Sequence, residues 1–323
     1  MMNVSGTHHS GPEGHDVAVA LEDAVADLGT RLASRQPSDR RFGAPIQAWY
    51  PVARADRRGG VCRARLHGEW IDLSGGVPQG DIRTTDCGLW QLTNRFDLIW
   101  ACPASTIACP DLPDAPKSRL VLIAYSEEPA LADYDQAVLG LLDPAHVPMI
   151  HDSWWWRSQK RRTKTKAYAP SPFGFTAVAS DAFASTPAYD LVSRERKVSI
   201  EFRLPSIRLE RVTARNFELL NLTTITPLAE GELLLRNLIL CSADALRFIH
   251  PMLSALGRSF LRQDVAVLER LEGRSPDLPL VFAGDPDRPS AFYFASKAAL
   301  SRAQRDGGVY KNPVEPEVLR WST

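Results

Sequence analysis

Two stretches in the second half of the chain decide its fold: Phe217-Glu-Leu-Leu-Asn-Leu-Thr-Thr-Ile-Thr-Pro227 and Glu232-Leu-Leu-Leu-Arg-Asn-Leu-Ile-Leu-Cys241. Both consist mainly of Leu, Ile and Thr, and the short gap between them is typical of consecutive strands. Similar apolar runs precede them at Phe173–Ala184, Lys197–Arg203 and Ile207–Thr213. Because no long gap interrupts most of this series, we predict an antiparallel meander.

Segments with helical periodicity flank the predicted meander. Apolar positions recur at helical spacing from about Ala243 to Glu272, and the chain from Asp287 on adds one more helix before the segment Asn312–Thr323. On the N-terminal side, Arg119–Tyr125 is a compact apolar run and Pro129–His146 has helical periodicity. The predicted class is therefore α+β, with an antiparallel sheet and a long C-terminal helix packed against it.

The first part of the chain has a different texture. A tail rich in Gly, His and Ser is followed by helical spacing at Val17–Ala33, and residues 45–101 contain short apolar runs divided by Gly-Gly and Pro. These patterns predict a tail with one helix and then a small β-rich module. Cys102–Lys117 is rich in proline, as linkers are. We therefore predict three parts: 1–44 as tail and helix, 45–117 as β module and 118–323 as main domain.

Composition and charge exclude several function classes. With 323 residues, 44% of them hydrophobic, and a formal net charge of +0, the chain can bury a large core and has no overall basic field for nucleic acid. The one basic run, Arg157–Lys166, is predicted to be a solvated loop, with docking of an acidic partner as the alternative. No stretch has the apolar length of a transmembrane helix, and residues 1–16 lack a signal-peptide core, so we expect a cytoplasmic protein without a membrane span.

The stretch Gly140–Arg157 concentrates chemically active side chains, namely two histidines, two carboxylates and three tryptophans. Pro148 lies between His146 and His151, so a helix that carries Asp143 and His146 should end near it, with His151 on the following turn. This break lets the two imidazoles converge on one point. On the helical part, Asp143 and His146 would lie on one face, where the carboxylate could orient the imidazole.

A third ligand is predicted on the long helix. Asp264 lies inside an apolar stripe, where a carboxylate without a partner would be costly and therefore needs a cation or strong donors. Two histidines and one carboxylate form the ligand set of non-haem Fe(II) oxygenases. The alternatives are plain core packing of His146 and His151, and pairing of Asp264 with Arg262 or another arginine. The stripe consists of Leu261, Val265, Leu268 and Leu271.

The order of these residues resembles the catalytic domain of the Rieske-type non-haem iron oxygenases, the family of the aromatic-ring-hydroxylating dioxygenase alpha subunits. That family carries D-x-x-H-x4-H and, far downstream, a helix with the acidic ligand; here the matching segments are Asp143–His151 and Gln263-Asp264. Further segments between Pro45 and the C-terminus are similar to the same family: Gln47-Ala-Trp-Tyr-Pro-Val-Ala, Phe96-Asp-Leu-Ile-Trp, Glu201-Phe-Arg-Leu-Pro, Asn312-Pro-Val and Leu319-Arg-Trp-Ser.

The resemblance implies a role for each matched residue. His146, His151 and Asp264 would hold Fe(II), and Asp143 would be the catalytic carboxylate that bridges electron delivery from the cluster of a neighbouring subunit. It also implies a helix-grip (START-like) sheet as the substrate cavity, in agreement with the meander and the long helix. Gly140 departs from the pattern, because the family often has an asparagine near this position.

The largest departure lies in the β module. A Rieske cluster needs two cysteines and two histidines, usually as C-x-H followed by C-x2-H. His67 is the one histidine between Pro45 and Gln136, and the segment Cys62-Arg-Ala-Arg-Leu-His67 is too long for the second half-motif. We therefore expect a degenerate, truncated Rieske domain and no Rieske [2Fe-2S] cluster in this chain. The cysteines include no C-x2-C pair and are expected to be inert: Cys62, Cys87, Cys102, Cys109 and Cys241.

Three functions are compatible with this combination. The first is an oxygenase component that uses mononuclear Fe(II) to hydroxylate or demethylate a small apolar organic substrate, with electrons from a Rieske-bearing subunit, a ferredoxin or a reductase, in a trimer or mixed oligomer. The second is a non-catalytic structural or ligand-binding subunit of such a complex. The third is a metal enzyme that takes electrons from its substrate or a soluble reductant. Trp154, Trp155 and Trp156 would pack the loop after His151 or line the cavity.

Overall fold

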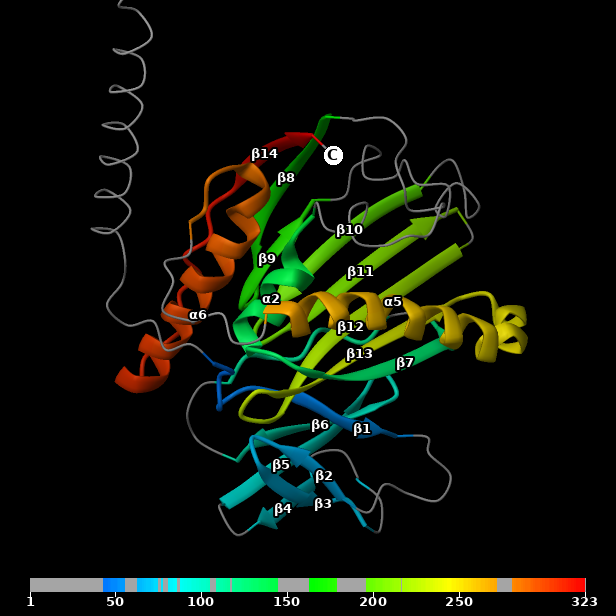
Figure 1. Ribbon diagram of the computed structural model, residues 1–323, viewed down its shortest axis with the longest axis vertical. Coiled ribbons are helices and arrows are strands. Elements are labelled where there is room, and N and C mark those ends of the chain that lie inside the picture. The colour runs from blue at the N-terminus through cyan, green and yellow to red at the C-terminus, as the bar shows by residue number, and fades with distance from the viewer. Residues whose placement is uncertain are drawn as a thin grey trace, which may run out of the picture. The chain divides into compact units, whose positions relative to one another are not determined.

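An eight-stranded antiparallel sheet forms the centre of the structure, which is a computed structural model (Figure 1). The structure describes residues 43–55, 63–74, 77, 81–85, 88–104, 109–116, 118–144, 163–178, 196–215, 217–271 and 281–322. The strands of the large sheet lie in the order β14 (Glu317–Ser322), β8 (Thr163–Ser171), β9 (Gly174–Ala177), β10 (Arg196–Arg203), β11 (Ile207–Ala214), β12 (Phe217–Ala229), β13 (Glu232–Cys241) and β7 (Val121–Leu131).

The order of the strands confirms the predicted meander. From β8 to β13 each strand pairs with the next one along the chain. The first two stretches quoted above form β12 and β13, in which Leu219 lies opposite Cys241 at one end and Ala229 lies opposite Glu232 at the other. The strands β7 and β14 complete the two edges of the sheet. With few helices beside one large antiparallel sheet, the class is α+β, as predicted.

The helices lie on one side of the large sheet (Figure 1). The long helix α5 (His250–Leu271) follows the short 3-10 segment η2 (Asp244–Ile249) and crosses β7 and β13, as the periodicity from Ala243 on predicts. Two further helices, α2 (Tyr134–Leu142) and α6 (Arg288–Asp306, after η3, Asp285–Asp287), contact each other. No helix among the described residues is long and apolar enough to cross a membrane.

A smaller β module precedes the large sheet. It contains a four-stranded sheet and a two-stranded hairpin, as the short apolar runs before the linker predict. The four-stranded sheet has the order β1 (Tyr50–Arg54), β6 (Leu98–Pro103), β5 (Gly88–Arg95) and β4 (Asp81–Thr85), and the hairpin consists of β2 (Arg63–Leu66) and β3 (Glu69–Asp72).

The two faces of the large sheet pack against different partners. We call the face that carries Phe202, Ile225 and Leu235 the helix face, because these residues share a core with the buried side chains of α5 and α6. The opposite face, the module face, packs its apolar side chains against Leu98 and Trp100 of β6. A strand alternates its side chains between the two faces, so every second residue of each strand belongs to the helix face.

Arg236 joins the module face to the β module. Its side chain is 4% exposed and donates from Nη1 to the carbonyl of Pro51 at 2.7 Å and from Nη2 to the carbonyl of Val52 at 3.0 Å. These carbonyls are available because the pairing of β1 with β6 is irregular between Pro51 and Ala53. A buried guanidinium needs several acceptors, and the backbone of β1 supplies them.

The hairpin of the β module is held as well. The turn between β2 and β3 donates two backbone hydrogen bonds to the end of β12: from His67 N–H to the carbonyl of Pro227 at 2.9 Å, and from Gly68 N–H to the carbonyl of Leu228 at 2.7 Å. His67 occupies the left-handed region with φ 51°, and its ring meets the edge of the Tyr50 ring with 5.2 Å between centroids. The hairpin therefore contacts the large sheet through its turn.

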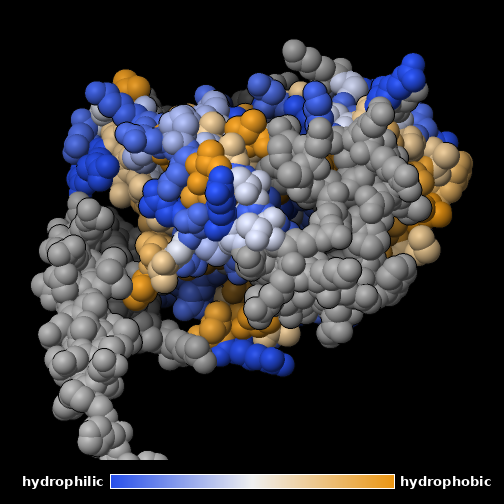
Figure 2. All heavy atoms as spheres, turned by 90° about the horizontal axis from the view of Figure 1, so that it is seen from above, coloured by the Kyte–Doolittle hydropathy of each residue, from blue (hydrophilic) through white to orange (hydrophobic). Residues whose placement is uncertain are grey.

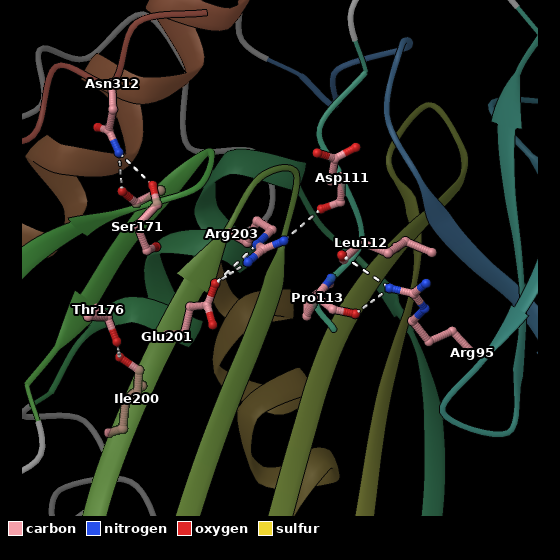
Figure 3. A network of polar contacts seen from close by, with 11 residues as sticks. Arg95, Asp111, Leu112, Pro113, Ser171, Thr176, Ile200, Glu201, Arg203 and Asn312 are labelled. Atoms are coloured by element: carbon pink, nitrogen blue, oxygen red, sulfur yellow. Dashed lines mark hydrogen bonds and ion pairs between the residues drawn. The ribbon is translucent and has the colours of Figure 1, made fainter. Parts of the chain in front are cut away.

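The described part of the predicted linker is fixed by arginines from both sheets (Figure 3). Arg95 of β5 donates to the carbonyl of Pro113 at 2.7 Å, and Arg203 of β10 donates to the carbonyl of Asp111 at 3.1 Å. Arg203 is itself held by two hydrogen bonds to Glu201, at 2.7 and 3.0 Å. Residues 109–116 thus run in a defined path between the two sheets.

Several predicted boundaries differ from the structure. The strand predicted at Phe173–Ala184 is described only as β9, and the helix predicted at Val17–Ala33 lies outside the described residues. The basic run Arg157–Lys166 is predicted to be a solvated loop, which is wrong for its last residues. Thr163–Lys166 begin β8 and pair with β14, so Lys164 and Lys166 belong to the large sheet.

Candidate metal centre and the polar helix face

The helix that precedes Asp143, the first candidate residue, ends earlier than the sequence pattern predicts. α2 ends at Leu142, and Asp143 is its C-cap with φ −65° and ψ 111°, outside the helical region. The cause is Pro144, because a proline disfavours the helical conformation of the residue before it. The expectation that Asp143 lies on a helix that runs on to His146 is therefore wrong. The partly buried carboxylate of Asp143 follows the last turn of α2.

Asp264 lies on α5 beside a buried stripe. Leu261, Val265 and Leu268 are buried, as the periodicity predicts, and Asp264 is partly buried among them. Asp264 also interacts with a neighbouring group. Arg262, which the sequence offers as an alternative partner for Asp264, is largely exposed and donates to Glu128 of β7 at 3.1 Å.

The end of α2 contacts the C-terminal half of α5. A Cβ atom at Gly140 would lie 4.0 Å from Leu268 Cδ2, which is an ordinary packing distance. Asp143 follows Gly140 by three residues and Asp264 precedes Leu268 by four, so each carboxylate is about one helical turn from this contact. The fold thus brings two of the four predicted site residues onto adjoining segments.

The two predicted histidine ligands lie outside the described residues. His146 and His151 lie in residues 145–162, outside the described part of the chain, as do Trp154, Trp155 and Trp156. The described residues alone contain no group of three or more His, Cys, Asp or Glu side chains that could hold a metal. The ligand set His146, His151 and Asp264 therefore stays a prediction.

A row of polar side chains crosses the helix face beneath α5. Asn237 of β13 donates to Asn221 Oδ1 at 2.6 Å and to Thr223 Oγ1 at 2.9 Å, both on β12. A Cβ at Gly257 of α5 would lie 2.9 Å from Ser126 Oγ of β7 and 3.9 Å from Asn237 Oδ1. A glycine at this position lets α5 lie close to the polar row without displacing the Ser126 hydroxyl, and these polar side chains were not predicted as site residues.

Charged side chains extend the polar row towards the other edge of the sheet. Arg208 and Glu210 of β11 pair with Thr223 and Asn221, and they contact each other at 3.1 Å. Lys166 of β8 has a pKa that is lowered to about 8, by burial first and then by the charge of Arg208. The sequence contains a signal for these residues, since each stands at an alternate position of a predicted strand or of the basic run.

Two of the cysteines lie in contact. Cys102 Sγ and Cys109 Sγ are 2.9 Å apart, and Cys241 is buried. The hydrogen bond with Cys109 and burial together raise the pKa of the Cys102 thiol far above its usual value. A thiol in this state is a poor nucleophile and a poor metal ligand. Cys62 and Cys87 lie outside the described residues.

Comparison with known proteins finds a similar fold among solved structures. No family model matches the chain, and no curated protein matches it. NdmA of Pseudomonas putida CBB5, solved with caffeine, matches with a TM-score of 0.57 and 13% identity over 84% of this chain and 96% of its own. NdmB of the same strain matches with a TM-score of 0.54 and 12% identity over 81% and 93% of the two chains.

Dicamba monooxygenase gives a similar match. Its structure with non-haem iron and dicamba has a TM-score of 0.56 and 12% identity, over 82% of this chain and 100% of its own. At such identities the likeness shows a shared fold alone: the large sheet and the helix α5 belong to the same fold as these solved structures.

Proposed function

We propose that this chain is the oxygenase component of a Rieske-type system, and that it hydroxylates or demethylates an organic substrate at a mononuclear Fe(II). The proposal is supported above all by the contact of α2 with α5, which sets Asp143 and Asp264 on adjoining segments within an oxygenase fold. His146, His151 and Asp264 would hold the iron. Bound Fe(II) would supply the activation of O2.

The described donors are compatible with this ion. Asp264 offers a carboxylate on a rigid helix, and the buried leucines around it limit access of water, as is usual for a catalytic metal site. Asp143 has left the helix and is partly buried, so its carboxylate can accept a hydrogen bond from an imidazole beside it. Its role in this proposal is to orient a ligand and to connect it with the electron donor.

Electrons would come from another protein. The β module lacks the two half-motifs of a Rieske cluster, so we propose a degenerate Rieske domain that binds no cluster. A match over 84% of the chain is longer than residues 118–323, so the likeness to NdmA reaches into the chain before the main domain. We propose a Rieske-bearing oxygenase subunit, a ferredoxin or a reductase as electron source, in a cytoplasmic trimer or mixed oligomer.

Iron binding tests the proposal directly. The purified chain is reconstituted with Fe(II) without oxygen, and its iron content is measured by mass spectrometry after desalting. We expect stoichiometric iron in the wild type and loss of iron in His146→Ala and Asp264→Asn. Asp143→Asn should retain iron but lower turnover with the electron donor. Asp306→Asn is the matched control for a lost carboxylate, because Asp306 is 68% exposed and its ion pair with Arg305 lies at the surface.

The second candidate function is a non-catalytic subunit that keeps the sheet as a ligand-binding surface. The missing cluster motif favours it. Under this function Asp264→Asn would not change iron content, and His146→Ala would leave the activity of an assembled complex unchanged. The third candidate, a metal enzyme without an electron-donating partner, requires substrate-dependent O2 uptake by the isolated chain.

A further inference from the structure

Two cysteine sulfur atoms meet at the point where the β module leads into the linker. Cys102, the last residue but one of β6, is 2% exposed, and its Sγ lies 2.9 Å from Sγ of Cys109. Both residues are free thiols. A disulfide bond is about 2.05 Å long, so the two sulfur atoms need to approach by less than about 1 Å to become bonded. The fold therefore holds the two thiols in position for a covalent bond.

The chain on both sides of this contact is fixed by other interactions. Cys102 belongs to the paired residues of β5 and β6. Beyond Cys109, arginines of β5 and β10 bind the backbone carbonyls of residues 111–113 (Figure 3). Leu112 is buried in the same core as Trp100 of β6. Each sulfur atom is thus positioned by backbone that is held independently of the contact between the thiols.

The two thiols differ in their access to solvent. Cys109 is partly exposed, whereas Cys102 is buried. A dissolved oxidant therefore reaches the sulfur of Cys109 first. The hydrogen bond with Cys109, and burial after it, keep the pKa of the Cys102 thiol far above its usual value, so Cys102 is itself a poor target for the oxidant. An accessible thiol beside a sheltered second one is typical of cysteines that sense oxidants.

We propose that Cys102 and Cys109 form an oxidation site, in which a peroxide converts the two thiols into a reversible disulfide that fastens the linker to β6. The sulfur of Cys109 attacks one oxygen of hydrogen peroxide, the O–O bond breaks, and a sulfenic acid forms as the first water leaves. The sulfur of Cys102 then attacks the Cys109 sulfur, the S–O bond breaks, and the second water leaves with the Cys102 proton. The sulfur atoms lose two electrons in total, and these reduce the peroxide to water. A dithiol reverses the reaction by thiol–disulfide exchange.

The disulfide would change the junction between the β module and the main domain. In the thiol form the two sulfur atoms share a weak hydrogen bond. In the disulfide form the chain between Cys102 and Cys109 is a closed loop, which removes open conformations of the linker. The linker leads to β7, the strand that contacts α5. Oxidation would thus fix the path of the chain from one part to the other, a role that differs from the inert cysteines expected from the sequence.

The cysteine pair and the candidate metal centre belong to different faces of the large sheet. The linker packs Leu112 into the core of the module face, whereas α5, which carries Asp264, covers the helix face. Seen from above, the end of the molecule that bears β8 and β14 has a mixed surface of hydrophilic and hydrophobic residues (Figure 2), and the β module lies at the opposite end (Figure 1). The oxidation site therefore does not depend on the proposed metal site.

Peptide mass spectrometry of the full chain tests the oxidation site. The reduced, folded protein is treated with a few equivalents of hydrogen peroxide, free thiols are blocked with N-ethylmaleimide, and the chain is digested with trypsin without a reductant. Both cysteines lie on the tryptic peptide Phe96–Lys117. An internal disulfide makes this peptide lighter by two hydrogen atoms and leaves no thiol to block. We expect this species in the wild type, and its reversal by dithiothreitol.

Single variants separate the roles of the two thiols. Cys102→Ser should leave oxidised Cys109 as a sulfenic acid, which dimedone traps, and Cys109→Ser should leave Cys102 unmodified. Cys241→Ser is the matched control, because Cys241 is another buried thiol and its loss should not change the yield of the disulfide. Absence of the internal disulfide in the folded wild type, or a disulfide from this pair to Cys62, Cys87 or Cys241, would overturn the proposal.

Hydrogen exchange measures the consequence for the linker. The amides of residues 109–116 should exchange at least about tenfold more slowly in the disulfide form than in the thiol form, because the closed loop opens less often. The same peroxide treatment of Cys102→Ser should leave this exchange unchanged. Equal exchange rates in the two forms of the wild type would show that the disulfide does not fasten the linker, and would overturn this part of the proposal.

Discussion

The ammonium nitrogen of Lys297 on α6 lies 2.5 Å from a carboxylate oxygen of Asp135 on α2, and the two side chains are only 9% and 2% exposed. The same carboxylate accepts a hydrogen bond from the Tyr293 hydroxyl and another, at 2.8 Å, from the Gly43 N–H. Asp135 thus joins α2, α6 and the start of the described chain. This buried group therefore helps to hold the helix α2, which leads to Asp143.

Asp135→Asn should destabilise the fold by about 3–5 kcal/mol, because it removes the carboxylate that is in direct contact with the buried Lys297 ammonium. Chemical denaturation measures the free energy of unfolding. In the double variant Asp135→Asn with Lys297→Met much of this loss should be recovered. The exposed pair Arg305–Asp306 is the control, and Asp306→Asn should cost less than about 1 kcal/mol. Equal losses of unfolding free energy in Asp135→Asn and Asp306→Asn would contradict a stabilising role of the buried Asp135–Lys297 pair.

Arg236→Lys should loosen the β module from the large sheet. A lysine cannot reproduce the two guanidinium hydrogen bonds to Pro51 and Val52, so we expect a loss of about 2–4 kcal/mol and faster hydrogen exchange of the amides in β1. Arg65→Lys provides the comparison, because Arg65 joins β2 to Glu232 of β13 in a partly exposed ion pair. Unchanged exchange in β1 would show that Arg236 does not hold this strand.

Gly174→Ala should be strongly destabilising. A Cβ at this position would lie 2.0 Å from the carbonyl oxygen of Phe202, a backbone atom of the neighbouring strand that cannot move away alone. We expect a loss of at least about 2 kcal/mol in denaturant unfolding. Gly140→Ala should act in the opposite direction and stabilise by about 0.5–1 kcal/mol, because Gly140 is helical and its Cβ would meet Leu268 at an ordinary distance.

His67 should make stability depend on pH. Burial lowers its pKa in the folded state to about 4 from the ordinary 6.5, so the unfolded chain binds the proton more readily. The contribution of neutral His67 to the free energy of unfolding is fully present above pH 6.5. It is lost as the pH falls towards 4, by at most about 3 kcal/mol. An asparagine tolerates the left-handed backbone at this position. His67→Asn should therefore make the free energy of unfolding depend less on pH in this range. Denaturant unfolding of both proteins across this pH range measures the difference, and an unchanged pH dependence in His67→Asn would contradict this role of His67.

The local patterns of the chain were sufficient to predict its class and the buried stripe beside Asp264. Alternation and short gaps predicted β10 to β13, and the buried stripe around Asp264 followed from the spacing of Leu261, Val265 and Leu268. These patterns succeed because the side-chain period of a strand or helix is a local property. The end of α2 at Leu142 also has a local signal, Asp143-Pro144, because a proline disfavours the helical conformation of the residue before it.

Other features could not be predicted because they depend on residues that are distant in the chain. The sequence by itself determined an antiparallel sheet, a long helix and a carboxylate that faces a core. Only the tertiary structure decided that the end of the basic run joins the large sheet as β8, that Arg208 and Glu210 lie opposite Thr223 and Asn221, and that Asp135 meets Lys297. Local periodicity predicts the side on which a residue lies, whereas strand order and sheet curvature determine which distant charge it meets there.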